Sequence, residues 1–516
     1  MGRWRRAGPP FVPLEGRQAC NIVWALAALH QQHHALINAA LPVLLASSAS
    51  LTSQELGNAI WSFAKVRRDD AVLFRQVSQE LAKRSMSSSS VRDMVNMAWG
   101  YAVTGLSSYP FLAGLPEEVL PWFPCLTSQD IANLAHALAK NNLNSNSFLT
   151  MVVSLHQDIV RKMDARELCM LLWAITRCAL SHDEFYDAHR AGPQDAFPAC
   201  LTFLQMPFFC FVAEHLMHGD SEALDAQLAA SVAWSFASLS ICDTLLFEHL
   251  ASCCMLQGAL VQMSEQQVAN LSWAFAAVSI AHTSLFKAVA SVARKKQVSW
   301  DISHACNVAL ALVVVGHYDV VLLEAVLSRG KSRLSVLQAD QLRQIDMGIC
   351  LEHHLVSQPN GKPLTSEEFE QYTKFRSWAP QVWELPRQAE TRSSELHLHT
   401  SSMLTEIGVP HVNEHRILHH FDVDIWLVGS PLVLEVDGPA HYVFPLNLQS
   451  NTPYSPWLNG RTQLKRRLLR QAGYWAISIK YSDVTALTDS DFKKYLARCL
   501  ESHPWENKGW NAELKK

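Results

Sequence analysis

The sequence has little charge, no closely spaced cysteine pair of the metal-binding kind and no long uninterrupted apolar segment. Charged residues make up 17% of the 516 residues, against 49% hydrophobic ones, which excludes a largely disordered chain. None of the 12 cysteines forms a Cys-x-x-Cys pair, so neither a zinc ribbon nor a disulfide scaffold is expected. Amides, histidines and prolines interrupt the uncharged stretches, so we expect no membrane span. The net charge of −4 confines any nucleic-acid site to a local cluster of cations.

A repeated pattern occupies most of the chain. Its anchor is a tryptophan or a substitute, and successive anchors lie 37 to 39 residues apart except for one interval of 61. The anchors are Trp24, Trp61, Trp99, His136, Trp173, Trp234, Trp273 and Leu310. In all eight units the position after the anchor is small and the next is large and apolar. This regularity indicates a repeat array with an insertion near residues 181–205.

Each unit of the pattern predicts a pair of helices. A residue such as Thr52 stands at a helix N-cap position, and the apolar residues from Leu56 onward follow helical spacing. A second amphipathic segment, such as residues 73–84, follows each anchor segment. One helix pair cannot bury its apolar face alone, so we expect about eight pairs to stack into an α-helical repeat solenoid over residues 18–330. We interpret the anchor tryptophans as core residues, and the asparagines three positions before them as hydrogen-bonded within the array.

Two basic clusters recur at similar distances from their anchors. They are Lys83 with Arg84, and Arg294 with Lys295 and Lys296, all 21 to 23 residues after an anchor. Cations in matching positions of a solenoid are candidates for contact with an RNA backbone. The alternative is that they lie in the last turns of helices, where cations are favoured by the helix dipole.

The period and the unit Asn-x-x-Trp-Ala-Phe-Ala, found at residues 270–276, resemble the octotricopeptide repeat and the related helical region of FAST kinase-like organellar proteins. The resemblance covers about residues 18–330. It implies that the array binds single-stranded RNA.

A different domain ends the chain. Prolines and an Asn-Gly pair indicate a connector over residues 331–393. The residues after it predict a helix at 394–408, strands at 409–418, 423–428 and 431–436, a basic helix at 462–473, a strand at 475–479 and a helix at 490–502. We therefore expect a small α/β domain over residues 394–502, followed by a tail at 503–516.

Three acids lie on two neighbouring predicted strands of this domain. Glu435 and Asp437, two positions apart, point to the same side, and Asp424 lies on the preceding strand. With His441 beside them, these carboxylates are candidates to bind Mg²⁺ and activate water for phosphodiester cleavage. The alternative is that Glu435 and Asp437 hold the basic helix by ion pairs.

No acidic residue occurs from Gly438 to Ser482, whereas six cations do. The cations are Arg461, Lys465, Arg466, Arg467, Arg470 and Lys480. Tyr442 and Trp457 precede the basic helix and offer surfaces on which unpaired bases stack. This segment is therefore the predicted RNA-binding part of the domain.

The motif Leu434-Glu-Val-Asp-Gly-Pro-Ala-His441, followed by Asn459-Gly-Arg-Thr462 and Leu464-Lys-Arg-Arg-Leu-Leu469, resembles the RAP domain. The resemblance covers about residues 394–500 and implies a restriction-endonuclease (PD-(D/E)XK) fold. The nuclease pattern has a lysine two residues after the glutamate, where this chain has Asp437. Lys465 or His441 would have to replace that lysine in a nuclease.

The two resemblances together imply an organellar RNA-binding protein that acts in transcript processing, stability, ribosomal RNA maturation or translation. Its expected partner is single-stranded RNA without a preference for DNA, with ribonucleoprotein or ribosomal factors as further partners, in a mitochondrion or plastid. No cofactor is required by this interpretation. Two alternatives stay open: an Mg²⁺-dependent endoribonuclease using Asp424, Glu435 and Asp437, and a protein-binding helical scaffold.

Overall fold

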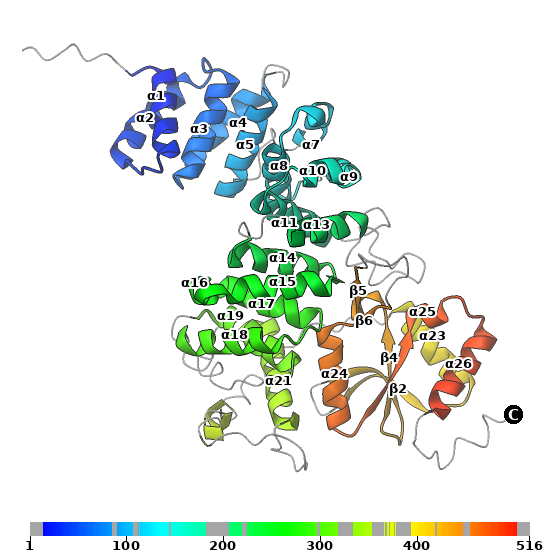
Figure 1. The fold of residues 1–516 in the computed structure, drawn as a ribbon. Helices are drawn as coiled ribbons and strands as arrows, with labels where there is room; N and C mark the ends of the chain where they lie inside the picture. The colour runs from blue at the N-terminus through cyan, green and yellow to red at the C-terminus, as the bar shows by residue number, and fades with distance from the viewer. Residues whose placement is uncertain are drawn as a thin grey trace, which may run out of the picture. The chain divides into compact units, whose positions relative to one another are not determined.

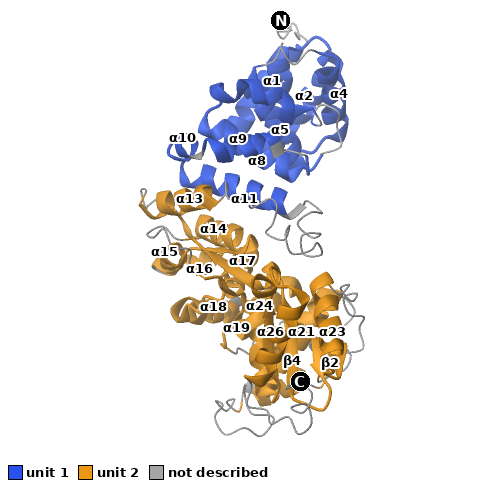
Figure 2. Ribbon diagram, turned by 90° about the vertical axis from the view of Figure 1, so that its right-hand side faces the viewer, with its two compact units in different colours: residues 1–181 blue, residues 182–516 orange. Residues whose placement is uncertain are grey.

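The computed structural model describes residues 14–84, 90–106, 112, 114–143, 146–181, 206–218, 224–296, 300–317, 334–352, parts of 366–377, 394–417, 421–446 and 455–502. The chain divides into two compact units, residues 1–181 and 182–516 (Figure 2). Helices dominate both units, and the second also contains a small mixed sheet region (Figure 1). Within the described part of the chain, no helix has the length and apolar character that crossing a membrane requires.

The first unit is built from successive helices that each carry an anchor. These anchor helices pack against one another in chain order and are α1 (Gly16–Ala28), α3 (Ser53–Lys65), α5 (Val91–Thr104), α8 (Ser128–Lys140) and α11 (Ala165–Ser181). The helices between them are α2 (His34–Ser47), α4 (Ala71–Ala82), α7 (Leu115–Val119), η2 (Leu120–Cys125), α9 (Asn146–Ser154) and α10 (His156–Val160).

The N-caps form where the sequence predicts them. The Thr52 hydroxyl accepts from the Glu55 N–H while the Glu55 carboxylate accepts from the Thr52 N–H. The same reciprocal arrangement occurs at the start of α5, α8 and α17 (Glu265–Ala277). It satisfies amides that have no partner within the helix and so fixes where each anchor helix begins.

The anchor helices approach closely because the residue after the anchor is small. Gly100 of α5 lies against Ile60 of α3, and a Cβ atom added at Gly100 would lie 2.6 Å from the Ile60 Cγ2 atom. The large residue that follows, such as Phe63 or Tyr101, is fully buried. The two positions after each anchor therefore provide the close packing that the repeat pattern indicates.

In the second unit, α13 (Met206–His218) precedes three further anchor helices, α14 (Ala226–Ser238), α17 and α19 (Ile302–Val314), which again pack in order. Between them lie α15 (Thr244–Met255), η4 (Leu256–Gly258), α16 (Ala259–Gln262) and α18 (Thr283–Lys296). The predicted insertion, apart from Ser181, lies outside the described residues. The predicted connector contains a helix, α21 (Val336–Glu352), which packs against α19.

The C-terminal domain has the predicted helices and strands. They are α23 (Glu395–Glu406), β2 (His411–Ile417), β3 (Phe421–Leu427), β4 (Leu432–Asp437), α24 (Gly460–Gln471), β7 (Trp475–Lys480) and α26 (Asp489–Glu501). The strands form one sheet in the order β2-β3-β4-β7, with only the β4–β7 pair parallel. Helices α23 and α26 contribute Leu404, Phe492 and Leu496 to a core with one face of this sheet.

Short elements missed by the prediction complete the domain. They are η6 (Pro439–His441), β5 (Tyr442–Pro445), β6 (Trp457–Leu458) and α25 (Tyr481–Val484). Strand β5 pairs with β6 and also, in parallel, with β1 (Ile241–Cys242) in the loop after α14. A second, three-stranded sheet thus joins the C-terminal domain to the helical array.

Candidate nucleic-acid interface

The acids of β4 face the basic helix α24. Successive side chains of a strand point to opposite faces, so Leu434 and Val436 enter the core with α23 and α26 while Glu435 and Asp437 point the other way. Lys465 Nζ lies 2.5 Å from Glu435 Oε2, and Arg466 donates a hydrogen bond to Asp437 Oδ2. Both carboxylates are almost completely buried. Glu435 and Asp437 therefore hold the basic helix against the sheet.

Burial shifts the pKa values in this cluster. Burial raises the pKa of Glu435 to about 7, an effect that Lys465 opposes and Asp424 reinforces. Burial alone would lower the pKa of Lys465, but the neighbouring Glu435 and Asp424 outweigh it, so that pKa is raised. Burial also lowers the pKa of His441, with Asp437 opposing the shift. Lys465 therefore stays charged at neutral pH. Glu435, with a pKa of about 7, is protonated in part of the molecules at that pH.

The three acids do not form the predicted metal site. Asp424 Oδ2 accepts from the Val436 N–H at 2.6 Å, while the other two carboxylates are paired with α24. Throughout the described residues, no three His, Cys, Asp or Glu side chains are grouped so that they could hold a metal ion. The Mg²⁺ prediction therefore does not fit this arrangement, because Lys465 and Arg466 occupy the positions where a cation would be bound.

Four polar atoms of the cluster are buried without a hydrogen-bond partner. They belong to Glu435 (Oε1), Asp437 (Oδ1), Tyr442 (OH) and Arg466 (Nε). His441 Nδ1 lies 3.7 Å from Asp437 Oδ1, beyond hydrogen-bond distance. The cluster thus contains buried carboxylate, hydroxyl and guanidinium atoms that make no hydrogen bond to a neighbouring group.

The opposite side of α24 contacts the helical array, so that α24 lies between the sheet and the anchor helices (Figure 1). Arg467 donates to the carbonyls of Val313 and Val314 at 2.6 and 2.9 Å, at the C-terminal end of α19. A guanidinium there neutralises the negative end of the helix dipole. Arg467, a predicted RNA contact, thus makes a contact within the chain.

The loops that follow the anchor helices also contact the C-terminal domain. Together with the contacts of α24 they form what we call the docking surface. Trp457 Nε1 donates to the Val278 carbonyl at 2.9 Å, and Ser279 Oγ donates to the Leu458 carbonyl at 2.8 Å. The Phe444 N–H donates to the Ser240 carbonyl at 2.7 Å. Trp457 is therefore engaged with the array rather than presented to bases.

Of the six predicted cations of this domain, Arg461, Arg470 and Lys480 are exposed. They remain available to an RNA backbone, whereas Lys465, Arg466 and Arg467 contribute mainly to the fold. The sequence showed that the cations are concentrated here, but not which of them face the protein's own acids and carbonyls.

The anchor tryptophans are not core residues, and this corrects the prediction. Trp24 is 48% exposed and Trp273 is 37% exposed, and the other anchors are half-buried. The asparagines three positions before the anchors are likewise exposed or half-buried. Side chains three and four positions apart share one side of a helix, so Asn and Trp form rows along an accessible face.

Exposed cations extend these rows in the first unit. Lys65, Lys140 and Arg177 lie four residues after their anchors, and Arg17, Arg92 and Arg166 lie seven residues before theirs. Positions −7, −3, 0 and +4 fall on one side of a helix. We call this surface of α1, α3, α5, α8 and α11 the anchor face. These cations are not clustered in the sequence, and only counting from each anchor reveals them.

Neighbouring anchors on this face contact one another. The rings of Trp61 and Trp99 lie 6.4 Å apart, and those of His136 and Trp173 lie 4.9 Å apart. Burial lowers the pKa of His136 to about 4, so its imidazole is neutral at physiological pH. The row is therefore aromatic and uncharged, with the cations on either side of it.

The predicted pair Lys83 and Arg84 is used within the first unit. Arg84 donates to the carbonyls of Leu51, Ser48 and Ala49, just after α2. Lys83 is exposed and paired with Glu80 at 2.7 Å. Arg84 thus follows the end of α4 and joins it to the residues after α2, which is neither an RNA contact nor a position in the last turn of its own helix.

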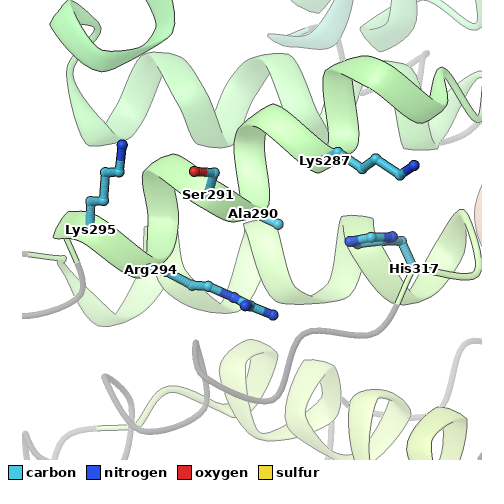
Figure 3. Close-up of a pocket in the computed structure, with 6 residues that line it drawn as sticks. All are labelled: Lys287, Ala290, Ser291, Arg294, Lys295 and His317. Carbon is cyan, nitrogen blue, oxygen red and sulfur yellow. The ribbon is translucent and has the colours of Figure 1, made fainter.

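The second predicted cluster lies on α18. Arg294 and Lys295 line a pocket there together with Lys287, Ser291, Ala290 and His317 (Figure 3). Lys296 is the last residue of α18, and its side chain lies outside the described residues. The structure therefore adds Lys287, Ser291 and His317 to the two residues that the sequence indicated.

The fold and the interface together define a helical-array protein whose C-terminal α/β domain is docked on the array through a basic helix. A family model described as the RAP domain matches residues 434–499, and this confirms the predicted resemblance for that part of the chain. No curated protein matches the chain.

Proposed function

We propose that this protein binds single-stranded RNA along the anchor face of its first unit. The observation that carries the proposal is the rows of accessible aromatic and cationic side chains on five successive helices, with an asparagine beside the anchor on the first four of them. Aromatic rings stack on unpaired bases of any sequence, and Lys and Arg neutralise phosphates. The RAP-domain match supports the same class of ligand.

The finer features of the proposal follow from the resemblance. We propose that the array consists of about eight octotricopeptide-like pairs and that the C-terminal domain has a restriction-endonuclease-like fold. We also propose that the protein acts in a mitochondrion or plastid, on transcript processing, stability, ribosomal RNA maturation or translation. Ribonucleoprotein or ribosomal factors are its proposed further partners.

Replacing cations of the anchor face tests the proposal. In Lys65→Gln/Lys140→Gln we expect weaker binding of a single-stranded RNA, and a slope of log affinity against log salt that is smaller by about 1.4, because two phosphate contacts are lost. Trp24→Ala removes a largely exposed ring and should lower affinity by about tenfold. Fluorescence anisotropy at several salt concentrations measures both effects.

Lys162→Gln is the matched control, because Lys162 is exposed but lies off the anchor face. It should leave the affinity and the salt slope unchanged. Equal RNA binding by wild type and the double variant would contradict the proposal. If wild type retained no RNA at low salt, the protein-scaffold alternative would replace it.

The nuclease alternative concerns the buried cluster of the C-terminal domain. The unfilled hydrogen-bonding atoms of Glu435 and Asp437 and the raised pKa of Glu435 favour it. The ion pairs to Lys465 and Arg466 oppose it, since both would have to open before a metal could bind. Labelled RNA incubated with Mg²⁺ tests it: cleavage by wild type that Asp437→Asn abolishes would support a nuclease.

A further inference from the structure

The pocket on α18 is cationic and separate from the buried acid cluster. Lys287, Ser291 and Arg294 follow one another at intervals of four and three residues, so they share one side of the helix, and Lys295 lies beside Arg294 at the edge of that side. His317 approaches from the residues that follow α19. The described lining contains three positive charges and no acid.

The arrangement of these side chains suits a phosphate group. Arg294 and His317 extend toward one another, whereas Lys287 and Lys295 come from positions further along α18 on either side of Ser291 and extend away from this pair (Figure 3). A guanidinium presents several N–H donors in one plane, which match the oxygens of a phosphate. The Ser291 hydroxyl and the His317 ring add directional hydrogen-bonding groups to these charges.

Charge and size distinguish a terminal phosphate from an internal one. An internal phosphodiester carries one negative charge, whereas a terminal phosphate carries about −1.5 to −2 at pH 7 and gains more from a guanidinium with two further cations nearby. The pocket has a volume of about 410 Å³, within the range of small-molecule sites and larger than one phosphate needs. It therefore has room for the sugar or base attached to that phosphate.

We propose that this pocket binds the terminal phosphate of an RNA strand. The proposal rests on the proposed RNA binding and adds a preference for one chemical state of the RNA end. Phosphates at the 5′ and the 3′ end share the chemistry that the pocket recognises. The experiment below tells them apart.

The test compares three forms of one oligoribonucleotide: with a 5′-phosphate, with a 3′-phosphate, and with neither. Wild type should bind one phosphorylated form about tenfold more tightly than the form with neither, as expected when charge-assisted hydrogen bonds are gained. In Lys287→Gln/Arg294→Gln this preference should disappear while the form with neither phosphate binds as it does to wild type. Anisotropy at constant ionic strength measures all three affinities.

Lys494→Gln is the matched control, since Lys494 is exposed on α26 and far along the chain from the pocket. It should keep the preference for the phosphorylated end. Equal affinity of wild type for all three RNAs would overturn the proposal. A double variant that weakens all three equally would do the same, because its cations would then contact internal phosphates.

A second measurement separates this proposal from the proposed function. Adenosine 5′-monophosphate and adenosine 3′-monophosphate are compared with adenosine for their effect on the Tm of the full chain. A rise with one monophosphate in wild type but not in the double variant supports the pocket even if long RNA does not bind. No rise with either monophosphate, together with no end preference in RNA, rejects the pocket whether or not the anchor face binds RNA.

Discussion

Glu435 is a carboxyl group that the fold buries beside Lys465, with Asp424 and Asp437 as further charged neighbours. Its side chain retains an oxygen without a hydrogen-bond partner. The interior disfavours its charged form more strongly than Lys465 favours it, and its pKa is therefore raised. The residue binds a proton in the folded state at a pH at which the unfolded chain has released it.

The raised pKa of Glu435 predicts a pH effect on stability. Between the unfolded pKa of 4.5 and the folded value of about 7, the folded state holds more protons, so its contribution to the free energy of unfolding falls as pH rises. Glu435→Gln removes this contribution. We expect the Tm of wild type to fall relative to that of the variant from pH 4.5 to 7, and the difference to level off above pH 7.

Calorimetric scans of both proteins across this pH range make the comparison. Taking the difference between them removes most of the opposite contribution of His441, whose pKa is lowered by burial. A Tm difference that rises with pH in favour of wild type would show that the pKa of Glu435 is depressed, as in an ordinary exposed ion pair.

At the scale of the element, the anchor helices share one way of ending. The residue six positions after the anchor has a positive φ in seven of the units, at His30, Arg67, Gly105, Asn142, Ser240, Ser279 and Gly316. The next N–H then bonds back into the helix, as from Ile280 to the Phe275 carbonyl at 2.9 Å. This turn directs the chain into the following helix and, at Ser240 and Ser279, also supplies contacts to the C-terminal domain.

Substitution of Gly105 tests the left-handed turn. Gly105 has a φ of +73°, and a Cβ atom added there would meet nothing within 4 Å, so Gly105→Ala introduces backbone strain without a clash. We expect the free energy of unfolding to fall by about 1 kcal/mol. Gly114→Ala is the control, because Gly114 has a φ of −87° and comparable room for a methyl group.

Urea denaturation followed by circular dichroism compares the two alanine variants with wild type. Equal stability of both variants would mean that the turn after α5 does not need a left-handed residue. A loss at Gly114 alone would point to packing rather than to the backbone conformation.

At the scale of the whole molecule, the second unit contains both the C-terminal domain and the anchor helices against which that domain packs. Strand β5 pairs with β1, and α24 lies against α17, α19 and α21. The two parts also approach closely at Gly460, where an added Cβ atom would lie 1.8 Å from the Ala276 carbonyl oxygen. Two backbones meet at this point, so no side chain can move aside to make room.

Gly460→Ala should therefore separate the domain from the array. Overpacking of this kind costs about 3 kcal/mol, and the amides of Phe444 and Leu446, which donate to Ser240 and Cys242, should exchange with solvent much faster. Hydrogen–deuterium exchange measured by mass spectrometry on peptides covering β5 reports this change.

Gly438→Ala is the control in the same domain, since a Cβ atom there meets nothing within 4 Å. Its β5 peptides should exchange as in wild type. Unchanged exchange in Gly460→Ala would show that the docking surface is not a stable contact in solution.

The sequence alone determined the helical character, the phase of the anchor pattern and the order of elements in the C-terminal domain. These features follow from local causes: caps such as Thr52, apolar spacing, and small residues such as Gly100 beside large ones. Such signals act within one or two helical turns and can therefore be recognised in a single sequence. The RAP motif could be recognised for the same reason, because its residues lie close together in the chain.

Only the tertiary structure decided which face of each helix is covered. The anchor tryptophans stay partly accessible because the buried residues on either side of Trp61 and Trp99 fill the contact between the anchor helices, while the two rings touch each other. Lys465 pairs with the Glu435 carboxylate and Arg467 with the Val313 carbonyl, both far away in the chain. No local sequence pattern predicts such long-range contacts. Composition fixed how many cations this chain has, whereas long-range packing fixed which of them are left for a ligand.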